Sequence, residues 1–193
     1  MRPLSPADIR PPSVYEPVRQ DARRRVIELK RPRRVAVGSL LTLMFENRET
    51  VRGVIEELLR AERIEEPQRI AEEIATFNEL IPGTGELSAT LFLEITDQGE
   101  LAHRLHELIG IEDHVHLEIG GTRVGRRAEE GRAREDRTSS VHYLRFHLDD
   151  SQRAAFLSGG FEVALAADHP HYTERTVLDE RQRMALAEDL LGH

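Results

Sequence analysis

The sequence contains no cysteine and no tryptophan. Without cysteine the chain cannot form disulfides, thiolate metal sites or iron–sulfur ligation, and it has no thiol nucleophile. The absence of cysteine fits a reducing compartment, and we expect a cytoplasmic location. Aromatic residues make up only 5% of the chain, which argues against a stacking platform for single-stranded nucleic acid.

Long apolar runs are absent as well. No stretch approaches the roughly 20 apolar residues that a membrane-spanning helix needs, so we expect no membrane insertion. Residues 1–15 contain early prolines and lack an apolar core, which argues against a secretory signal peptide.

The motifs of several familiar enzyme classes are missing. The sequence has no phosphate-binding glycine loop, no Gly-x-Ser-x-Gly nucleophile elbow, no His-Glu-x-x-His zinc motif and no dinucleotide fingerprint. The sequence therefore assigns no reaction and no catalytic residue.

Hydrophobic residues are nevertheless frequent enough to build a core. The chain has 193 residues, of which 39% are hydrophobic and 32% are charged. Their periodic spacing indicates a folded protein, and the length predicts a single α+β domain over residues 15–193. Four prolines in residues 1–14 predict an extended N-terminal arm. Short loops between strands predict a mostly antiparallel sheet with helices packed on it.

The individual elements follow from spacing and capping residues. Apolar residues three and four apart predict helices at 15–31, 47–63, 67–81, 100–109, 149–158 and 179–191, with a capping box formed by Asp97 and Glu100 before the fourth. Alternating or continuous apolar runs predict strands at 35–37, 40–46, 87–95, 115–119, 122–126, 141–148 and 161–167. The charged stretch 126–138 is predicted to be a mobile loop.

Basic charge is concentrated in one segment. Residues 19–34 carry a net charge of +6, whereas the rest of the chain carries −14. Such a segment can bind an acidic partner, a lipid or nucleic acid, or it can lie against the protein's own acidic surface. The acidic remainder repels phosphate backbones, so nucleic acid is the weaker candidate. The candidate residues for docking a partner or an anion are Arg23, Arg24, Arg25, Arg60 and Arg63.

Arg60 and Arg63 also have a simpler interpretation. They are spaced to pair with Glu56, Glu57 and Glu66 on a solvated helix face. The sequence leaves both interpretations open and favours the solvated face.

The segment Asp168-His169-Pro170-His171-Tyr172 follows a predicted core strand. Loops at strand ends often carry functional side chains because the scaffold fixes them. His169 could bind a metal or transfer protons, with Asp168 orienting its ring. The alternative is a turn in which Asp168 accepts backbone hydrogen bonds.

His142 lies on the apolar face of its predicted strand. It is either a core residue or, together with His169, a ligand to Zn²⁺, Fe²⁺ or Mn²⁺. Glu46 or Asp168 would then be the third ligand or base, and an arginine would polarise a substrate. The candidate site comprises His142, Arg145, Asp168, His169, Tyr172, Glu46, Asn47 and Arg48.

Two further groups place histidine and glutamate on one face of an element. For both groups a solvated polar surface is the favoured interpretation over a metal site. The groups are His114, His116 and Glu118 on a strand, and Glu100, His103 and Glu107 on a helix.

Eight segments in fixed order are specific when taken together. They are RRRVIELKR at 23–31, RRVAVG at 33–38, TLMFENRETV at 42–51, LRAERI at 59–64, NELIP at 78–82, GIED at 110–113, SSVHYLRF at 139–146 and DHPHY at 168–172. Jointly the chain resembles the bacterial family catalogued as domain of unknown function 3501, over about residues 4–191. No biochemical activity is established for that family, so the resemblance implies no catalytic residues.

The resemblance does imply a cellular setting. Members of the family tend to be encoded near rubrerythrin-like di-iron proteins and iron–sulfur oxidoreductase subunits, which implies a redox or oxidative-stress system. We therefore hypothesise a binding or accessory protein that docks an iron–sulfur oxidoreductase subunit or a rubrerythrin-like protein. The alternative hypothesis is a metal-binding protein or metal-dependent enzyme that uses His142 and His169.

Overall fold

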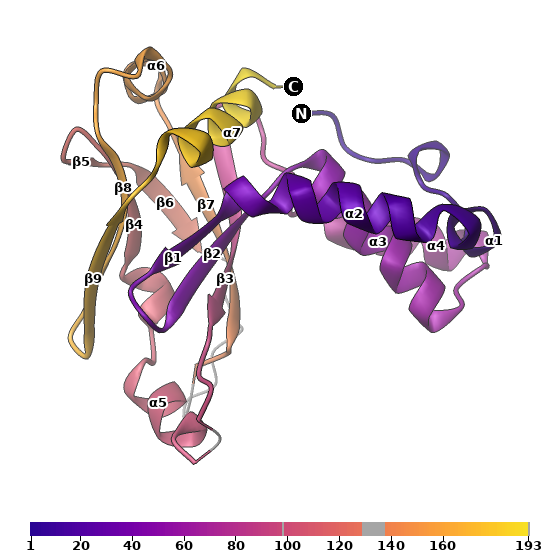
Figure 1. Cartoon of the computed structure of the whole chain (residues 1–193), viewed down its shortest axis with the longest axis horizontal. Coiled ribbons are helices and arrows are strands. Elements are labelled where there is room, and N and C mark those ends of the chain that lie inside the picture. The colour runs from indigo at the N-terminus through magenta and orange to yellow at the C-terminus, as the bar shows by residue number, and fades with distance from the viewer. Residues whose placement is uncertain (98, 129–137, 193) are drawn as a thin grey trace.

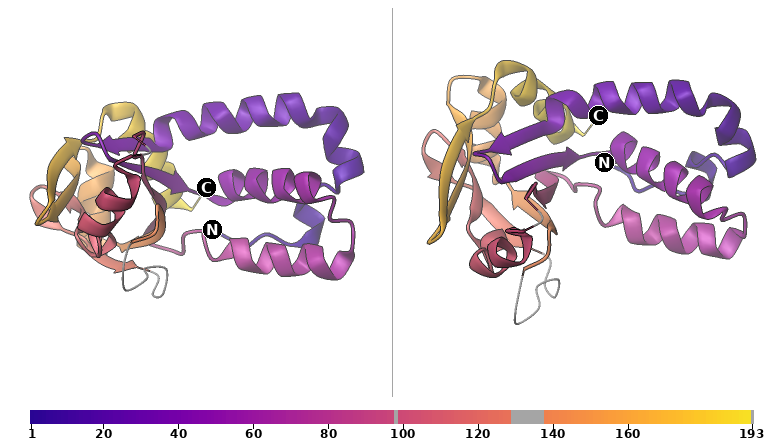
Figure 2. Two further views of the ribbon diagram at one scale, coloured as in Figure 1. Left: turned by 90° about the horizontal axis from the view of Figure 1, so that it is seen from below. Right: turned by 60° about the horizontal axis from the view of Figure 1, so that its bottom comes forward.

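Two antiparallel sheets and a projecting group of helices make up the described part of the chain, residues 1–97, 99–128 and 138–192 (Figure 1). The computed structural model places helices α1 to α4 to one side of the sheets, and two further views show the same projection (Figure 2). We call α1 to α4, together with the residues that precede α1, the helical arm. Within the described residues, no helix is both long and apolar enough to cross a membrane.

The strands form one sheet of order β1-β2-β3-β7-β6 and another of order β5-β4-β8-β9. All their pairings are antiparallel. The strands are β1 (Arg34–Val37), β2 (Leu41–Glu46), β3 (Glu86–Leu93), β4 (Val115–Ile119), β5 (Thr122–Arg123), β6 (Gly125–Ala128), β7 (Val141–His147), β8 (Val163–His169) and β9 (Tyr172–Val177).

The helices begin largely where the sequence provides capping residues. Asn47, Asp149 and Asp179 each accept hydrogen bonds from backbone N–H groups in the first turn of the following helix. The helices are α1 (Pro12–Tyr15), α2 (Arg19–Lys30), α3 (Arg48–Glu62), α4 (Pro67–Asn78), α5 (Leu101–Glu107), α6 (Asp150–Ser158) and α7 (Glu180–Leu191), with short 3₁₀ turns at η1 (Pro6–Asp8), η2 (Glu16–Val18), η3 (Arg31–Arg33) and η4 (Ile111–Asp113).

The two sheets share one hydrophobic core, to which both contribute fully buried residues such as Leu43, Leu117 and Leu165. Tyr172 at the start of β9 connects the sheets. Its hydroxyl donates to the carbonyl oxygen of Val37 at 2.6 Å and accepts from the backbone N–H of Leu40 at 3.0 Å. The second sheet is therefore fastened to the β1–β2 turn of the first by hydrogen bonds as well as by apolar packing.

The helical arm has a hydrophobic core of its own. Ile55 and Leu59 on α3 pack with Ile74 on α4 and with Leu4 and Ile9 from the N-terminal segment. Leu4 also exchanges two backbone hydrogen bonds with the Asn78 side chain, at 2.8 and 2.9 Å. The first residues thus lie against α3 and α4 and complete the core of the arm.

A buried polar contact joins the arm to the sheets. The Asp189 carboxylate on α7 pairs with the Arg33 guanidinium and accepts a hydrogen bond from Asn47 Nδ2 at 3.2 Å. The side chains of Arg33 and Asp189 are 2% and 1% exposed. Arg33 precedes β1 and Asn47 follows β2, so Asp189 holds two of the places where the chain passes between arm and sheets. We call these three residues the joint.

The predicted fold class is confirmed: the chain is a single α+β domain with antiparallel strands. Its N-terminal residues are part of the helical arm, where η1 and α1 interrupt the extended backbone and Leu4 and Ile9 are buried. The strands form two sheets where one was expected. Strand β9 was missed because only Tyr172 of its side chains is buried, which leaves no apolar alternation. The Asp97–Glu100 capping box was wrong, since the Asp97 carboxylate accepts from the backbone N–H of Gly99 and α5 has no side-chain cap.

The predicted charged loop at 126–138 falls mostly outside the described residues. Residues 126–128 belong to β6, and Thr138 is buried. Residues 129–137 are not among those described.

Substitution of Asp189 by alanine is expected to destabilise the protein by about 3–5 kcal/mol, because it leaves the buried Arg33 guanidinium without its counter-charge. Urea unfolding followed by circular dichroism measures the change. Glu188→Ala, at an exposed neighbouring position, is the control and should change stability little. An equal, small effect of both substitutions would show that the joint contributes little.

The stability that depends on Asp189 should vary with pH. Burial raises the pKa of Asp189 to about 6, although Arg33 and Asn47 act in the opposite direction. The folded protein then binds this proton more tightly than the unfolded chain does, so the associated stability is lost as the pH rises from about 4 to about 6. The unfolding free energy of wild type minus that of Asp189→Asn should fall across this window. A difference that rises with pH would contradict the assignment.

Candidate functional site

Helix α2 is fixed at its two ends and is loosely covered in its middle. Tyr15 precedes it and Arg33 follows it, and both side chains are almost fully buried. The helix itself buries none of its twelve residues. Its close approach to α3 is at Val26, because Gly53 has no side chain: a Cβ at position 53 would lie 2.8 Å from Val26 Cγ2.

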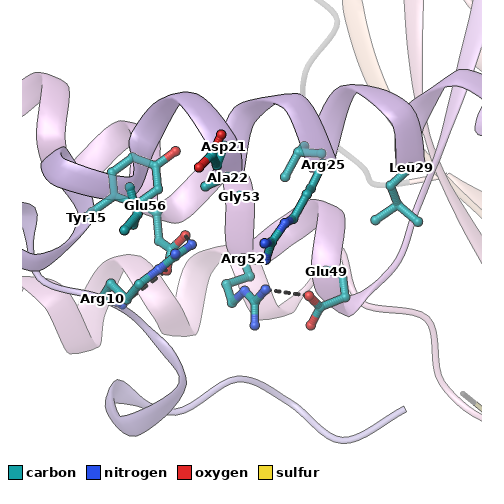
Figure 3. A pocket seen from close by; sticks show the side chains of 12 residues that line it. Arg10, Tyr15, Asp21, Ala22, Arg25, Leu29, Glu49, Arg52, Gly53 and Glu56 are labelled. Atoms are coloured by element: carbon teal, nitrogen blue, oxygen red, sulfur yellow. Dashed lines mark hydrogen bonds and ion pairs between the residues drawn. The ribbon is translucent and has the colours of Figure 1, made fainter.

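A cavity of about 520 Å³ lies between α2 and α3 on one side of the Val26–Gly53 contact, and a smaller one of about 320 Å³ lies on the other. We call the larger one the α2–α3 cavity. Its apolar lining comes mainly from the underside of α2, and its charged lining comes from both helices and from the N-terminal segment (Figure 3). Its residues are Arg10, Tyr15, Val18, Asp21, Ala22, Arg25, Val26, Leu29, Glu49, Arg52, Gly53 and Glu56.

One end of this cavity is formed by strong polar contacts. Arg10 Nη2 lies 2.5 Å and Arg10 Nε 2.8 Å from the two carboxylate oxygens of Glu56, and the Arg10 guanidinium stacks over the Tyr15 ring at 5.1 Å. The Tyr15 hydroxyl donates to Glu57 at 2.7 Å. Burial, and then the neighbouring Glu57 carboxylate, raise the pKa of Tyr15 to about 12. At this end of the cavity the charges of Arg10 and Glu56 therefore compensate each other.

Most cations of the basic segment pair with the protein's own carboxylates. Arg19 and Arg23 reach Glu57 on α3, at 3.0 and 4.0 Å. Arg24 and Arg31 make exposed pairs within their own segment, with Asp21 and Glu28, and Arg34 pairs with Glu94. Arg25 differs, since it makes no hydrogen bond or ion pair with any other residue that the structure describes.

The other two docking candidates lie at the far end of α3. Arg60 contacts Glu16 at 3.5 Å and Glu57 at 3.9 Å. Arg63 is exposed and ends α3 in the left-handed conformation, with φ of 53°.

The sequence-predicted candidate site is spread over three places. Glu46, Asn47 and Arg48 lie where β2 passes into α3. The Glu46 carboxylate accepts hydrogen bonds from Thr50 Oγ1 at 2.5 Å and Thr90 Oγ1 at 3.2 Å. Asn47 belongs to the joint, and Arg48 Nη2 lies 2.6 Å from an Asp8 carboxylate oxygen. The contacts of these three residues hold the arm in place.

His142 is buried on β7, as the apolar pattern of that strand indicated. Its Nε2 lies 2.8 Å from the carbonyl oxygen of Ser139 and 3.0 Å from Thr138 Oγ1, and its Nδ1 lies 3.7 Å from Glu112. Arg145, on the same strand, contacts Glu86 at 3.0 Å and the carbonyl oxygens of residues 79 and 81. Both side chains fasten β7 to neighbouring segments.

His169 lies on the other sheet, at the end of β8. Its Nε2 lies 3.1 Å from the carbonyl oxygen of Ile109, and its Nδ1 accepts from the backbone N–H of His171 at 3.2 Å. His142 and His169 therefore have different partners. The described residues include no group of three or more His, Asp or Glu side chains placed to hold a metal ion. A shared metal site for the two histidines stays a prediction.

Asp168, next to His169, joins a row of ion pairs on the outer face of the second sheet. Its carboxylate contacts Arg123 at 2.7 Å and His114 at 3.4 Å. Burial alone would raise the pKa of Asp168, but Arg123, His116 and His114 together outweigh burial, and the pKa is lowered. Farther along the face, hydrogen bonds from Arg175 and from His116 lower the pKa of Glu118. These carboxylates are ionised and paired, as a structural role requires.

The sequence indicates Arg25 as a docking candidate but does not predict the cavity beside it. Arg10, Tyr15 and Arg52 come from separate segments, and nothing local indicates that they meet. Gly53 was the available signal, because a glycine inside a helical pattern is costly and often marks a close approach of another element.

Comparison with known proteins gives a family and a structural relative. Residues 3–190 match the family model described as protein of unknown function (DUF3501). A crystal structure of a novel protein of unknown function from Burkholderia pseudomallei K96243 is 34% identical, with a TM-score of 0.91, and the match covers 98% of this chain and 100% of that chain. No curated protein matches the chain.

Metal analysis tests the predicted histidine site. Since the ring nitrogens of His142 and His169 already contact protein atoms, we expect far less than one equivalent of zinc, iron or manganese in untagged protein purified without oxygen. Mass spectrometry of the metals should give the same result for His142→Ala, for His169→Ala and for the exposed control His103→Ala. Stoichiometric metal that disappears in both variants but not in the control would contradict this expectation.

Proposed function

This chain belongs to the DUF3501 family, and we propose that it is a binding protein whose helical arm docks an acidic surface of a partner protein. The proposal rests on one observation about α2. This basic helix has no fully buried residue, and it projects with the arm away from the sheets (Figure 1). A helix of this kind adds little to the core. Its outward face is free to contact another molecule.

The outward face of α2 has the composition of an interface. The Arg24 and Arg31 side chains are 74% and 65% exposed, and Ile27 between them is 54% exposed. Arginine beside an apolar side chain is enriched in protein–protein interfaces. The face can therefore offer both charge and apolar area to a partner.

The internal ion pairs of this face do not oppose docking. Arg24–Asp21 and Arg31–Glu28 are exposed pairs three residues apart, and such pairs are worth only about 0.2–0.5 kcal/mol. A partner carboxylate that is desolvated on binding can replace them at small cost. Arg19 is released less easily, because its ion pair with Glu57 is more covered.

The family resemblance supports the choice of partner. Its redox setting favours an iron–sulfur oxidoreductase subunit or a rubrerythrin-like protein as the acidic partner. This chain has no cysteine, so any iron–sulfur cluster would belong to that partner.

Charge reversal on α2 tests the proposal. Binding of Arg23→Glu/Arg24→Glu to a candidate iron–sulfur subunit or rubrerythrin-like protein should weaken by about tenfold or more, and wild-type binding should weaken with rising salt. Biolayer interferometry measures both effects. Arg69→Glu/Arg181→Glu makes the same charge change at exposed positions away from α2 and should bind normally.

Two outcomes would overturn the proposal. Equal binding by the two double variants would remove α2 from the interface. Tight, strongly salt-dependent binding of a DNA duplex that is lost only in Arg23→Glu/Arg24→Glu would identify α2 as a nucleic-acid surface instead.

A further inference from the structure

The α2–α3 cavity has an elongated apolar wall that the fold leaves incompletely covered. Val18 at the end of η2 and then Ala22, Val26 and Leu29, on the side of α2 that faces α3, are four, four and three residues apart and line the cavity. Eleven residues of helix span about 16 Å. Ala22, Val26 and Leu29 are half-buried, and Val18 is 42% exposed. A narrow apolar chain fits this wall better than a compact ring does.

The charged side chains that line the cavity differ in whether they have an ion-pair partner. The three acidic side chains are each compensated: Glu56 by Arg10 at 2.5 Å, Glu49 by Arg52 at 2.6 Å, and Asp21 by Arg24 at 3.2 Å. Arg24 is not part of the lining, whereas Arg25 is. Among the residues that the structure describes, Arg25 is therefore the one arginine of the lining that pairs with no carboxylate.

Arg25 extends from α2 across the gap toward Arg52 on α3 (Figure 3). Two guanidinium groups that approach each other repel, and an anion placed between them removes the repulsion and accepts hydrogen bonds from both. Since Arg52 is bound to Glu49 through one nitrogen in this structure, other N–H groups of its guanidinium remain to donate. The pair forms a site for one anionic head.

We propose that the α2–α3 cavity binds a single-chain organic anion, with its carboxylate or phosphate between Arg25 and Arg52 and its apolar chain along Val18, Ala22 and Val26. The cavity volume of about 520 Å³ lies in the range of small-molecule sites. Because α2 is fixed at Tyr15 and Arg33 and open between them, a ligand can enter without unfolding the arm. This site is distinct from the outward face of α2 that carries the proposed partner docking.

Calorimetric titration with four probes tests the ligand chemistry. Decanoate and decyl phosphate carry both the head and the chain, whereas 1-decanol lacks the charge and inorganic phosphate lacks the chain. We expect the two amphiphilic anions to bind saturably at one site below their micellar concentrations. The other two probes should bind at least about tenfold more weakly.

Variants of one helix test the placement. Arg25→Gln should weaken decanoate binding by about tenfold, and Arg25→Lys should retain most of it because the charge remains. Arg31→Gln removes an equivalent charge directly after the same helix, at an exposed side chain that pairs with Glu28 outside the cavity lining, and is the matched control. Ala22→Phe should block the chain by filling the cavity, with circular dichroism showing whether α2 persists. Chemical-shift mapping of the wild type with decanoate should place the largest changes at Val26 and Gly53.

The proposal fails if Arg25→Gln and Arg31→Gln bind decanoate equally, or if 1-decanol binds as tightly as decanoate. Binding only to anionic phospholipid vesicles, with none to the free amphiphiles, would assign the basic helix to a membrane surface instead. Because the partner test changes Arg23 and Arg24 and this test changes Arg25 and Ala22, either proposal can fail while the other stands.

Discussion

The direction of the helical arm depends on one buried carboxylate. Asp189 contacts Arg33 just before the first strand and Asn47 just after the second, so a single side chain from α7 holds two neighbouring crossings between arm and sheets. A buried carboxylate or guanidinium costs several kcal/mol to desolvate, which is why each requires the other. Thr50 and Glu46 continue this polar contact into the first sheet, and the base of the arm is therefore specified by hydrogen bonds more than by apolar packing.

This arrangement helps to explain how α2 can remain a stable helix although none of its residues is fully buried. Few isolated helices of twelve residues persist in water, so α2 needs external support. Tyr15 supplies it at one end through Glu57, and Arg33 supplies it at the other through Asp189. The middle of the helix packs on α3 mainly through Val26, at Gly53, and its other contacts with the core are few. Its inner side borders a cavity, and its outer side presents cations to the surroundings.

The sequence predicts what depends on neighbouring residues and misses what depends on distant ones. Caps at Asn47, Asp149 and Asp179 and the apolar spacing of α3 are local signals, and they located the helices well. The division into two sheets, the joint and the cavity depend on contacts between residues far apart in the chain. The polar residues of the candidate site were grouped by their chemical character alone. The fold places them at the base of the arm, on β7 and at the end of β8.

The joint also limits the order in which parts of the chain can fold during synthesis. Arg33 and Asp189 are 156 residues apart, and a ribosome adds about 5–20 residues per second. Once the residues up to Ile74 have been made, the arm can assemble its own small core from Leu4, Ile55 and Ile74, but its base has no carboxylate to close on until Asp189 is added. Arg33, at the base of the arm, remains solvated until α7 has been synthesised. The arm's own core can therefore form before its base is fastened, and α7 can close the joint only as almost the final step.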